Sequence, residues 1–146
     1  MVNCIRDDCK QRGRKVALIC SSGVACQVYE RGVASTVHSY YGLGAADMPS
    51  DMLIARAISD VRVVEKLQSV DVIIWDEASM SSARMLELAN AAHHATSEGC
   101  NFPFAGTQMI VVGEFLQLRP VPNIFDAGEL MFLSNVFKHA IPHQIH

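Results

Sequence analysis

The chain has 146 residues, half of them apolar, which is enough to bury the core of one globular domain. Its apolar runs are far shorter than the roughly 20 residues that span a bilayer, and its start, MVNCIRDDCK, has acids where a signal peptide has its apolar core, so we expect an intracellular protein with no membrane partner. A net charge of −3 lacks the basic excess of duplex-binding proteins, and five cysteines without a CxxC pair argue against a disulfide framework or a zinc ribbon.

The first third of the chain predicts a helix, a strand and a second helix. Apolar residues three to four apart between Val2 and Cys9 predict a helix, and Gly13 is placed to end it. The apolar run KVALIC, residues 15–20, is bounded by turn residues and is typical of a buried parallel strand. We expect a helix from Gly23 to about Arg31.

Two helical regions and two strands follow. The segment STVHSYYGLG, residues 35–44, is expected to be a loop, and apolar residues at steps of three and four from Ile54 to Leu67 predict an amphipathic helical region. Asp71–Trp75 is a second buried strand. A helix from about Ser82 to His94 and a strand at Met109–Gly113 complete the pattern.

This alternation of strands and helices predicts an α/β fold, a three-layer sandwich with a mainly parallel sheet, in one domain that covers residues 1–146. Parallel sheets bind ligands beyond the carboxyl ends of their strands. We therefore expect Ser22, Asp76 and Gln117, each just after a strand, to lie on one rim.

Two adjacent acids, Asp76 and Glu77, end the second strand. This is the Walker B arrangement, in which an aspartate holds the magnesium ion of a nucleotide and a glutamate orients the attacking water. The two acids are equally suited to capping the helix that follows, because its positive N-terminal end favours acids. The pair alone leaves both interpretations open.

Three longer motifs favour the first interpretation. SSGVACQVYERGVASTVHSYYGLG, DVIIWDEASM and PFAGTQMIVVGEFLQLRPV occur in this order, and together they resemble the PIF-type (petite integration frequency) DNA helicases, including those of Helitron transposons. The resemblance implies the first RecA-like motor domain, a P-loop NTPase core, of a superfamily-one, 5′-to-3′, ATP-dependent DNA helicase. It further implies ATP, Mg2+ and single-stranded DNA as ligands, a role in DNA repair, recombination or telomere maintenance, and the nucleus, or else the mitochondrion, as the compartment.

The resemblance also assigns roles to residues. Asp76 would coordinate Mg2+, Glu77 would be the catalytic carboxylate, and Gln117 would sense the γ-phosphate, so that all three serve the bound ATP. DNA would be contacted by Ser21, Ser22 and Gly23, and by a second motif, Thr36, His38 and Ser39, with Tyr40 or Tyr41 stacking on a base. Helix capping accounts for the serines nearly as well, and a lone histidine is more often structural.

The sequence departs from the family in its phosphate-binding motif. GxxxxGK[ST] does not occur in these 146 residues, so we expect the chain to begin inside the helix that follows the phosphate loop, with the first strand of the core absent. A complete protein would carry that loop upstream and a second motor domain downstream. Smaller departures are Glu114 for aspartate, Arg119 for proline and Ala105 for glycine.

Three hypotheses about function remain. The chain is a piece of an active helicase, a catalytically inactive transposon remnant or DNA-binding module, or an unrelated α/β metal-dependent hydrolase that uses Asp76 and Glu77. The third requires further acids or histidines at neighbouring strand ends, where the sequence offers only Glu114.

Overall fold

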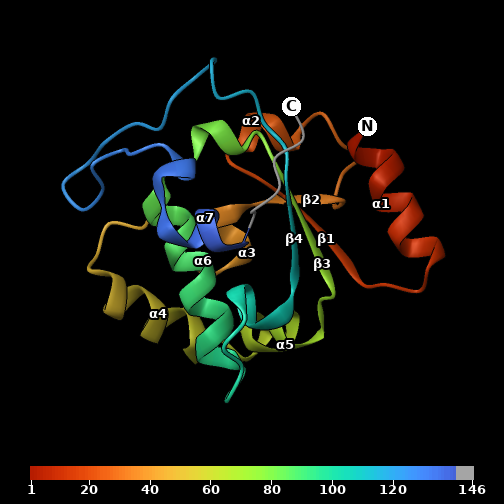
Figure 1. Ribbon diagram of the computed structural model, residues 1–146, viewed down its shortest axis with the longest axis horizontal. Helices are drawn as coiled ribbons and strands as arrows, with labels where there is room; N and C mark the ends of the chain where they lie inside the picture. The colour runs from red at the N-terminus through yellow and green to blue at the C-terminus, as the bar shows by residue number, and fades with distance from the viewer. Residues whose placement is uncertain (141–146) are drawn as a thin grey trace.

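The computed structural model describes residues 1–140 and contains a four-stranded, fully parallel sheet with helices on both faces (Figure 1). The strand order is β2-β1-β3-β4. The strands are β1 (Val16–Cys20), β2 (Ala34–Thr36), β3 (Val72–Asp76) and β4 (Gln108–Val111). This confirms the predicted α/β class, the three predicted strands and their parallel pairing.

The sheet also contains β2, which the sequence did not predict. Its three residues, Ala34–Thr36, pair with β1 and are half-buried. The segment is short, and two of its three residues carry hydroxyls, so it lacks the apolar run that marks the other strands. Its sequence pattern therefore favours a loop.

The helices are α1 (Val2–Gln11), α2 (Gly23–Cys26), α3 (Val37–Tyr40), α4 (Ser50–Ser59), α5 (Val61–Ser69), α6 (Ala83–Thr96) and α7 (Asn135–Ala140). Short 3-10 turns lie at η1 (Ala78–Met80), η2 (Pro103–Gly106) and η3 (Met131–Leu133). None of the helices within residues 1–140 is long and apolar enough to span a membrane.

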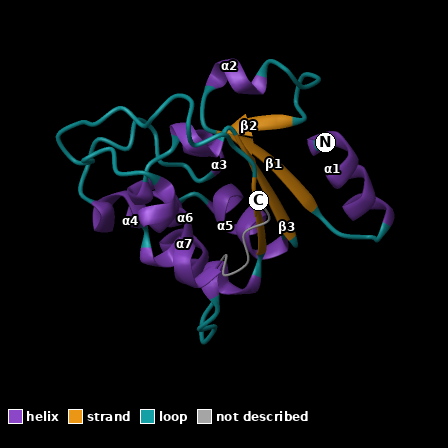
Figure 2. Cartoon of the chain, turned by 45° about the horizontal axis from the view of Figure 1, so that its top comes forward, coloured by secondary structure: helices purple, strands orange, loops and turns teal. Residues whose placement is uncertain are grey.

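The helices form two unequal layers around the sheet. On one face α1 lies alone, and its apolar residues, such as Ile5, pack with Leu18 and Ile74 of the sheet (Figure 2). The other face carries the larger core, in which fully buried Trp75 packs among side chains from α3 to α7. The three-layer prediction is therefore confirmed.

One helix prediction was wrong in extent, and the predicted helical region is confirmed but divided in two. The helix expected from Gly23 to about Arg31 ends at Cys26. The helical region of residues 54–67 is two helices, α4 and α5, because the side chain of Asp60 accepts the backbone N–H of Arg62 and caps a new helix at that point.

Ala105 is one of four non-glycine residues with positive φ within residues 1–140. Ala105 adopts φ 50° and ψ 34°, in the left-handed region, inside η2. A side chain at such angles brings Cβ close to a carbonyl oxygen, and glycine avoids that clash. Ala105 is also the position at which the family resemblance predicts glycine.

We expect Ala105→Gly to stabilise the protein by about 1 kcal/mol, because relief of the left-handed strain exceeds the entropy that glycine adds to the unfolded chain. The measurement is the free energy of unfolding from urea denaturation. Ala95→Gly, at an exposed position of α6, is the matched control and should destabilise by a similar amount. Destabilisation by both changes would contradict the assignment of strain to Ala105.

A histidine is buried in the larger core. His93 of α6 is 1% exposed, its Nε2 lies 3.0 Å from the hydroxyl of Tyr41, and its ring meets the ring of Phe104 edge to face. Burial, with a smaller contribution from His94, lowers the pKa of His93 from 6.5 to about 4. The core therefore contains a neutral imidazole at neutral pH.

This pKa predicts acid sensitivity. Between about pH 6.5 and about pH 4 the unfolded chain binds a proton at His93 that the folded chain does not, so the free energy of unfolding should fall as the pH falls through this window. His93→Gln should flatten that dependence in urea titrations at a series of pH values. His94→Gln retains His93 and should keep the wild-type dependence, and equal pH profiles for wild type and His93→Gln would refute the prediction.

Candidate functional site

The carboxyl ends of the strands bring three loops together. Cys20 of β1 pairs with Thr36 of β2 on one side and with Asp76 of β3 on the other, so these strands end level. The backbone N–H of Ser21 donates to the carbonyl of Asp76 at 3.3 Å. Beyond β3, the N–H of Ala78 donates to the carbonyl of Val112, just after β4, at 2.9 Å. The loops after β1, β3 and β4 thus form one rim.

Asp76 is half-buried at this rim and is held on both carboxylate oxygens. Its Oδ1 accepts the backbone N–H of Glu77 at 2.9 Å, and its Oδ2 accepts the hydroxyl of Tyr29. Each oxygen keeps a further lone pair, so the carboxylate retains room for another ligand.

Glu77 has an unusual backbone. Its φ of 54° and ψ of 38° place it in the left-handed region, which a residue with a side chain occupies at a cost of about 1–3 kcal/mol. The conformation turns the chain sharply out of β3 into η1. The half-buried Glu77 carboxylate makes no hydrogen bond or ion pair with the described residues.

A close backbone approach supports this turn. A Cβ built on Gly113 would lie 3.0 Å from the backbone nitrogens of Ala78 and Ser79, so a glycine is required where the loop after β4 passes η1. The loop then continues to Gln117, which is exposed and whose N–H donates to the carbonyl of Glu114 at 3.1 Å. Gln117 therefore lies on the loop that continues from this contact, and the hydrogen bond of its backbone N–H closes a short turn there.

Tyr29 is a site residue that sequence reasoning missed. Burial, followed by its hydrogen bond to Asp76, raises the pKa of its phenol, so it remains a donor at neutral pH. The two residues are 47 positions apart and share no spacing pattern. Burial likewise raises the pKa of the neighbouring Cys20 thiol to about 12, with Cys26, Asp76 and Glu77 adding to the effect.

Ser21 connects the loop after β1 to β3. Its Oγ accepts the indole Nε1–H of Trp75 at 3.1 Å and the hydroxyl of Ser81 at 2.7 Å. Trp75 immediately precedes Asp76, and Ser81 follows η1. A residue predicted to contact DNA is thus hydrogen-bonded on both sides of the acidic pair.

Ser22 and Thr36 have a different local role. The hydroxyl of Ser22 accepts the N–H of Ala25 at 3.2 Å and caps α2, and the hydroxyl of Thr36 accepts the N–H of Ser39 at 3.2 Å and caps α3. The capping alternative is therefore correct for these hydroxyls. Capping leaves backbone N–H groups at both helix starts near the rim, and Gly23 beside Ser22 is exposed.

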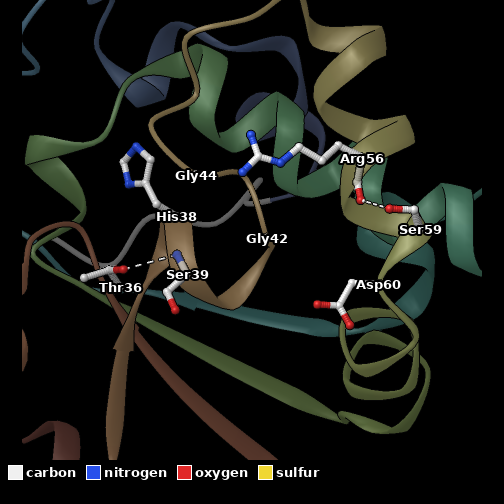
Figure 3. A pocket seen from close by; sticks show the side chains of 8 residues that line it. All are labelled: Thr36, His38, Ser39, Gly42, Gly44, Arg56, Ser59 and Asp60. Carbon is white, nitrogen blue, oxygen red and sulfur yellow. Dashed lines mark hydrogen bonds between the residues drawn. The ribbon is translucent and has the colours of Figure 1, made fainter.

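His38 and Ser39 line a cavity of about 560 Å³ beside α3 and α4 (Figure 3). Burial lowers the pKa of His38, so its ring is neutral at neutral pH. His38 also lines a second cavity, of about 190 Å³, together with Ser21 and Ser81. The residues predicted to contact DNA therefore border two neighbouring cavities, and neither cavity is lined by Asp76 or Glu77.

Neither Tyr40 nor Tyr41 presents its ring for stacking on a base in this structure. Tyr41 is fully buried, and Tyr40 is 7% exposed and packs edge to face on Tyr41. Lys66 covers the ring of Tyr40, with its Nζ 4.6 Å from the ring centroid. Both rings belong to the core, because α3 turns the apolar side of its short helix towards the sheet.

The described residues contain no group of three or more acids, histidines or cysteines that could enclose a metal ion. Mg2+ bound with a nucleotide does not require such a group, because it typically takes one or two carboxylates and completes its shell with phosphate oxygens and water. Asp76, with its free lone pairs at the rim, fits that donor set.

Comparison with known proteins agrees with this geometry. The family model described as PIF1-like helicase matches residues 1–135. The ATP-dependent DNA helicase Pif1 of Bdellovibrio bacteriovorus is 32% identical over 108 residues, which cover 74% of this chain and 24% of that protein.

Solved structures show the same fold. The Pif1 helicase from Candida albicans superposes with a TM-score of 0.80 at 27% identity. The superposed part covers 97% of this chain and 31% of the Candida albicans chain. The Pif1 helicase from Bacteroides in complex with ADP-AlF3 and ssDNA has a TM-score of 0.65 at 24% identity, over 86% of this chain and 30% of its own. The chain spans less than a third of each protein it matches.

The Ser21 cluster predicts a measurable coupling. Ser21→Ala leaves the buried indole N–H of Trp75 without its acceptor and should cost about 1–3 kcal/mol of unfolding free energy. In a Trp75→Phe background, which removes the donor, the same change should cost clearly less. The measurement is a double-mutant cycle by urea denaturation, and equal costs in the two backgrounds would show that the hydrogen bond is not what Ser21 contributes.

Proposed function

Since this chain belongs to the PIF1-like helicase family, we propose that it forms part of the first RecA-like motor domain of an ATP-dependent DNA helicase, which couples ATP hydrolysis to 5′-to-3′ movement on single-stranded DNA. The observation that supports this most directly is the acidic pair at the end of β3. The residues on either side of it, Trp75 and Ser81, both donate side-chain hydrogen bonds to Ser21. One rim thus carries a candidate nucleotide site beside a candidate DNA site.

Asp76 and Glu77 divide the work at the nucleotide. Asp76 would hold the Mg2+ of bound ATP, and the ion would neutralise charge on the phosphates. Tyr29 donates to Asp76 and orients it. The left-handed turn at Glu77 carries its otherwise unpaired carboxylate out of the sheet, where it can orient the attacking water.

Gln117 would link the nucleotide to the DNA. It is exposed on the loop that packs against η1 through Gly113. A displacement of this loop would therefore move Ala78 and Ser79, the residues that follow Glu77. On the DNA side, the proposed contacts lie at and just after the ends of β1 and β2, where backbone N–H groups and the hydroxyls not used as helix caps suit phosphate oxygens. They are Ser21, Ser22 and Gly23, and then Thr36, His38 and Ser39.

The compartment follows from the substrate. A DNA helicase of this family acts where DNA is held, which in a eukaryotic cell is the nucleus or the mitochondrion, and its role would be genome maintenance through repair, recombination or telomere upkeep. A Helitron-like origin would instead place the activity in transposition.

A catalytically inactive DNA-binding module is the second candidate. It is favoured by Arg119 and Glu114, which depart from the family's residues in the Gln117 loop. The two candidates differ in one observable: both bind single-stranded DNA, and only the motor domain supports ATP turnover. The metal-dependent hydrolase ranks last, because the described rim adds no third metal ligand.

The decisive experiment is a chimera in which residues 1–135 replace the matching segment of the Bdellovibrio relative. We expect ATP hydrolysis stimulated by single-stranded DNA. Glu77→Gln should lower turnover by about 100-fold or more while leaving nucleotide binding intact, because the water-orienting carboxylate is lost and Asp76 remains. Glu98→Gln, at an exposed loop position, removes the same charge and should leave turnover unchanged. A folded chimera that binds ATP without hydrolysing it would favour the inactive module.

In the same chimera, Gln117→Ala should lower the DNA-stimulated rate more than the unstimulated rate, because the amide is proposed to couple the two ligands. The measurement is steady-state hydrolysis with and without an oligonucleotide. If both rates fell by the same factor, Gln117 would be an ordinary catalytic or structural residue.

A further inference from the structure

The cavity that His38 and Ser39 line beside α3 contains an arginine that none of the motifs accounts for. It measures about 560 Å³ and lies between the end of β2, α3 and the end of α4 (Figure 3). Its lining residues are Thr36, His38, Ser39, Gly42, Gly44, Arg56, Ser59 and Asp60. Three of them, Thr36, His38 and Ser39, form the second predicted DNA motif, and Arg56 approaches from the opposite side.

The guanidinium of Arg56 is seated on a glycine. A Cβ built on Gly44 would lie 2.9 Å from Nη2 and 3.2 Å from Nη1 of Arg56, and Gly44 has φ 57°, which also favours glycine. Figure 3 shows the side chain extending from α4 across Gly44 towards His38. The group is thus placed by close contact with the backbone.

The donors of this guanidinium are unused. Across residues 1–140 the Arg56 side chain makes no ion pair and no hydrogen bond. The nearby Arg62, in contrast, is paired with Asp60, with Nη2 3.2 Å from Oδ2 and Nε 3.3 Å from Oδ1. Asp60 also lines the cavity, but its carboxylate is paired with Arg62. Arg56 therefore remains available for an anion.

The surroundings of Arg56 also suit an anionic oxygen. Ser39 is exposed at the opposite wall, where its hydroxyl can donate to such an oxygen, whereas the hydroxyl of Ser59 already donates to the backbone carbonyl of Arg56 at 2.6 Å. His38 joins this cavity to the smaller one that contains Ser21. A strand of DNA that follows Ser21 and His38 would therefore bring its next phosphates to Arg56.

We propose that Arg56 binds a backbone phosphate of single-stranded DNA in this cavity and extends the DNA path from Ser21 and His38 onto α4. The planar fork of a guanidinium matches two phosphate oxygens, and an unpaired one need not break an existing bond to bind them. Because the chain carries a net charge of −3, attraction to DNA depends on such individual cations. This inference rests on the proposed binding of single-stranded DNA and adds a contact that recognises phosphate without regard to sequence.

The test measures binding of the 146-residue chain to a fluorescent oligo(dT) by anisotropy, at salt concentrations between about 50 and 200 mM. We expect Arg56→Ala to weaken binding about tenfold at the lowest salt, as the loss of a charged hydrogen-bonding partner requires. The slope of log affinity against log salt should decrease in magnitude by about 0.7, the value for one phosphate on a single strand. Arg56→Lys keeps the charge but loses the fork, and should keep the slope with a smaller loss of affinity.

Arg12→Ala is the matched control. This substitution removes the same charge at the end of α1, on the other face of the sheet. There the Nε of Arg12 lies 3.0 Å from Oδ2 of Asp8, so loss of Arg12 should change DNA binding little. Equal effects of Arg56→Ala and Arg12→Ala, with thermal unfolding unchanged, would overturn this inference and leave the proposed function standing. A wild-type chain that is folded and does not bind oligo(dT) would overturn both.

Discussion

The parallel register of β1 on β3 is the constraint on which the site depends. Because Cys20 lies opposite Asp76, the residues that follow the two strands must emerge side by side. The N–H of Ser21 then reaches the carbonyl of Asp76, and its hydroxyl reaches the indole of Trp75. A shift of one residue would turn every side chain of the shifted strand to the opposite face of the sheet and separate these groups. The buried apolar faces of both strands oppose such a shift.

Polar groups buried around this register have matched partners. The indole of Trp75, the hydroxyl of Ser81 and the phenol of Tyr29 each donate to an oxygen at the rim, so none is buried without a hydrogen bond. These bonds hold the loops after β1 and β3 in one arrangement. The strain at Glu77 is tolerated because its surroundings are held in place. Its own N–H donates to the Asp76 carboxylate, and after it Ala78 donates to Val112 while Gly113 lies close to Ala78 and Ser79. A preorganised acidic pair is the result.

The side of the rim proposed to bind DNA is organised by small helices and by glycine. The short helices α2 and α3 begin at the ends of β1 and β2, and the hydroxyls of their caps, Ser22 and Thr36, are already used in hydrogen bonds to the helix backbone. The same arrangement buries Tyr40, whose ring packs in the core. What remains available are backbone donors, the His38 and Ser39 side chains, and the Arg56 guanidinium on Gly44. Such a surface suits a sugar–phosphate backbone better than a stack of bases.

The sequence by itself determined the elements with strong local patterns. Apolar runs predicted β1, β3 and β4, and from them the expectation that Ser22, Asp76 and Gln117 lie on one rim. Only the tertiary structure decided what had no local pattern: the pairing of β2, the hydrogen bond of Tyr29 to an acid 47 positions away, and the seat of Arg56 on Gly44. The reason is physical. Periodicity records which face of an element is buried, whereas the partner of a polar side chain is set by distances between elements, and those distances exist only once the sheet has formed.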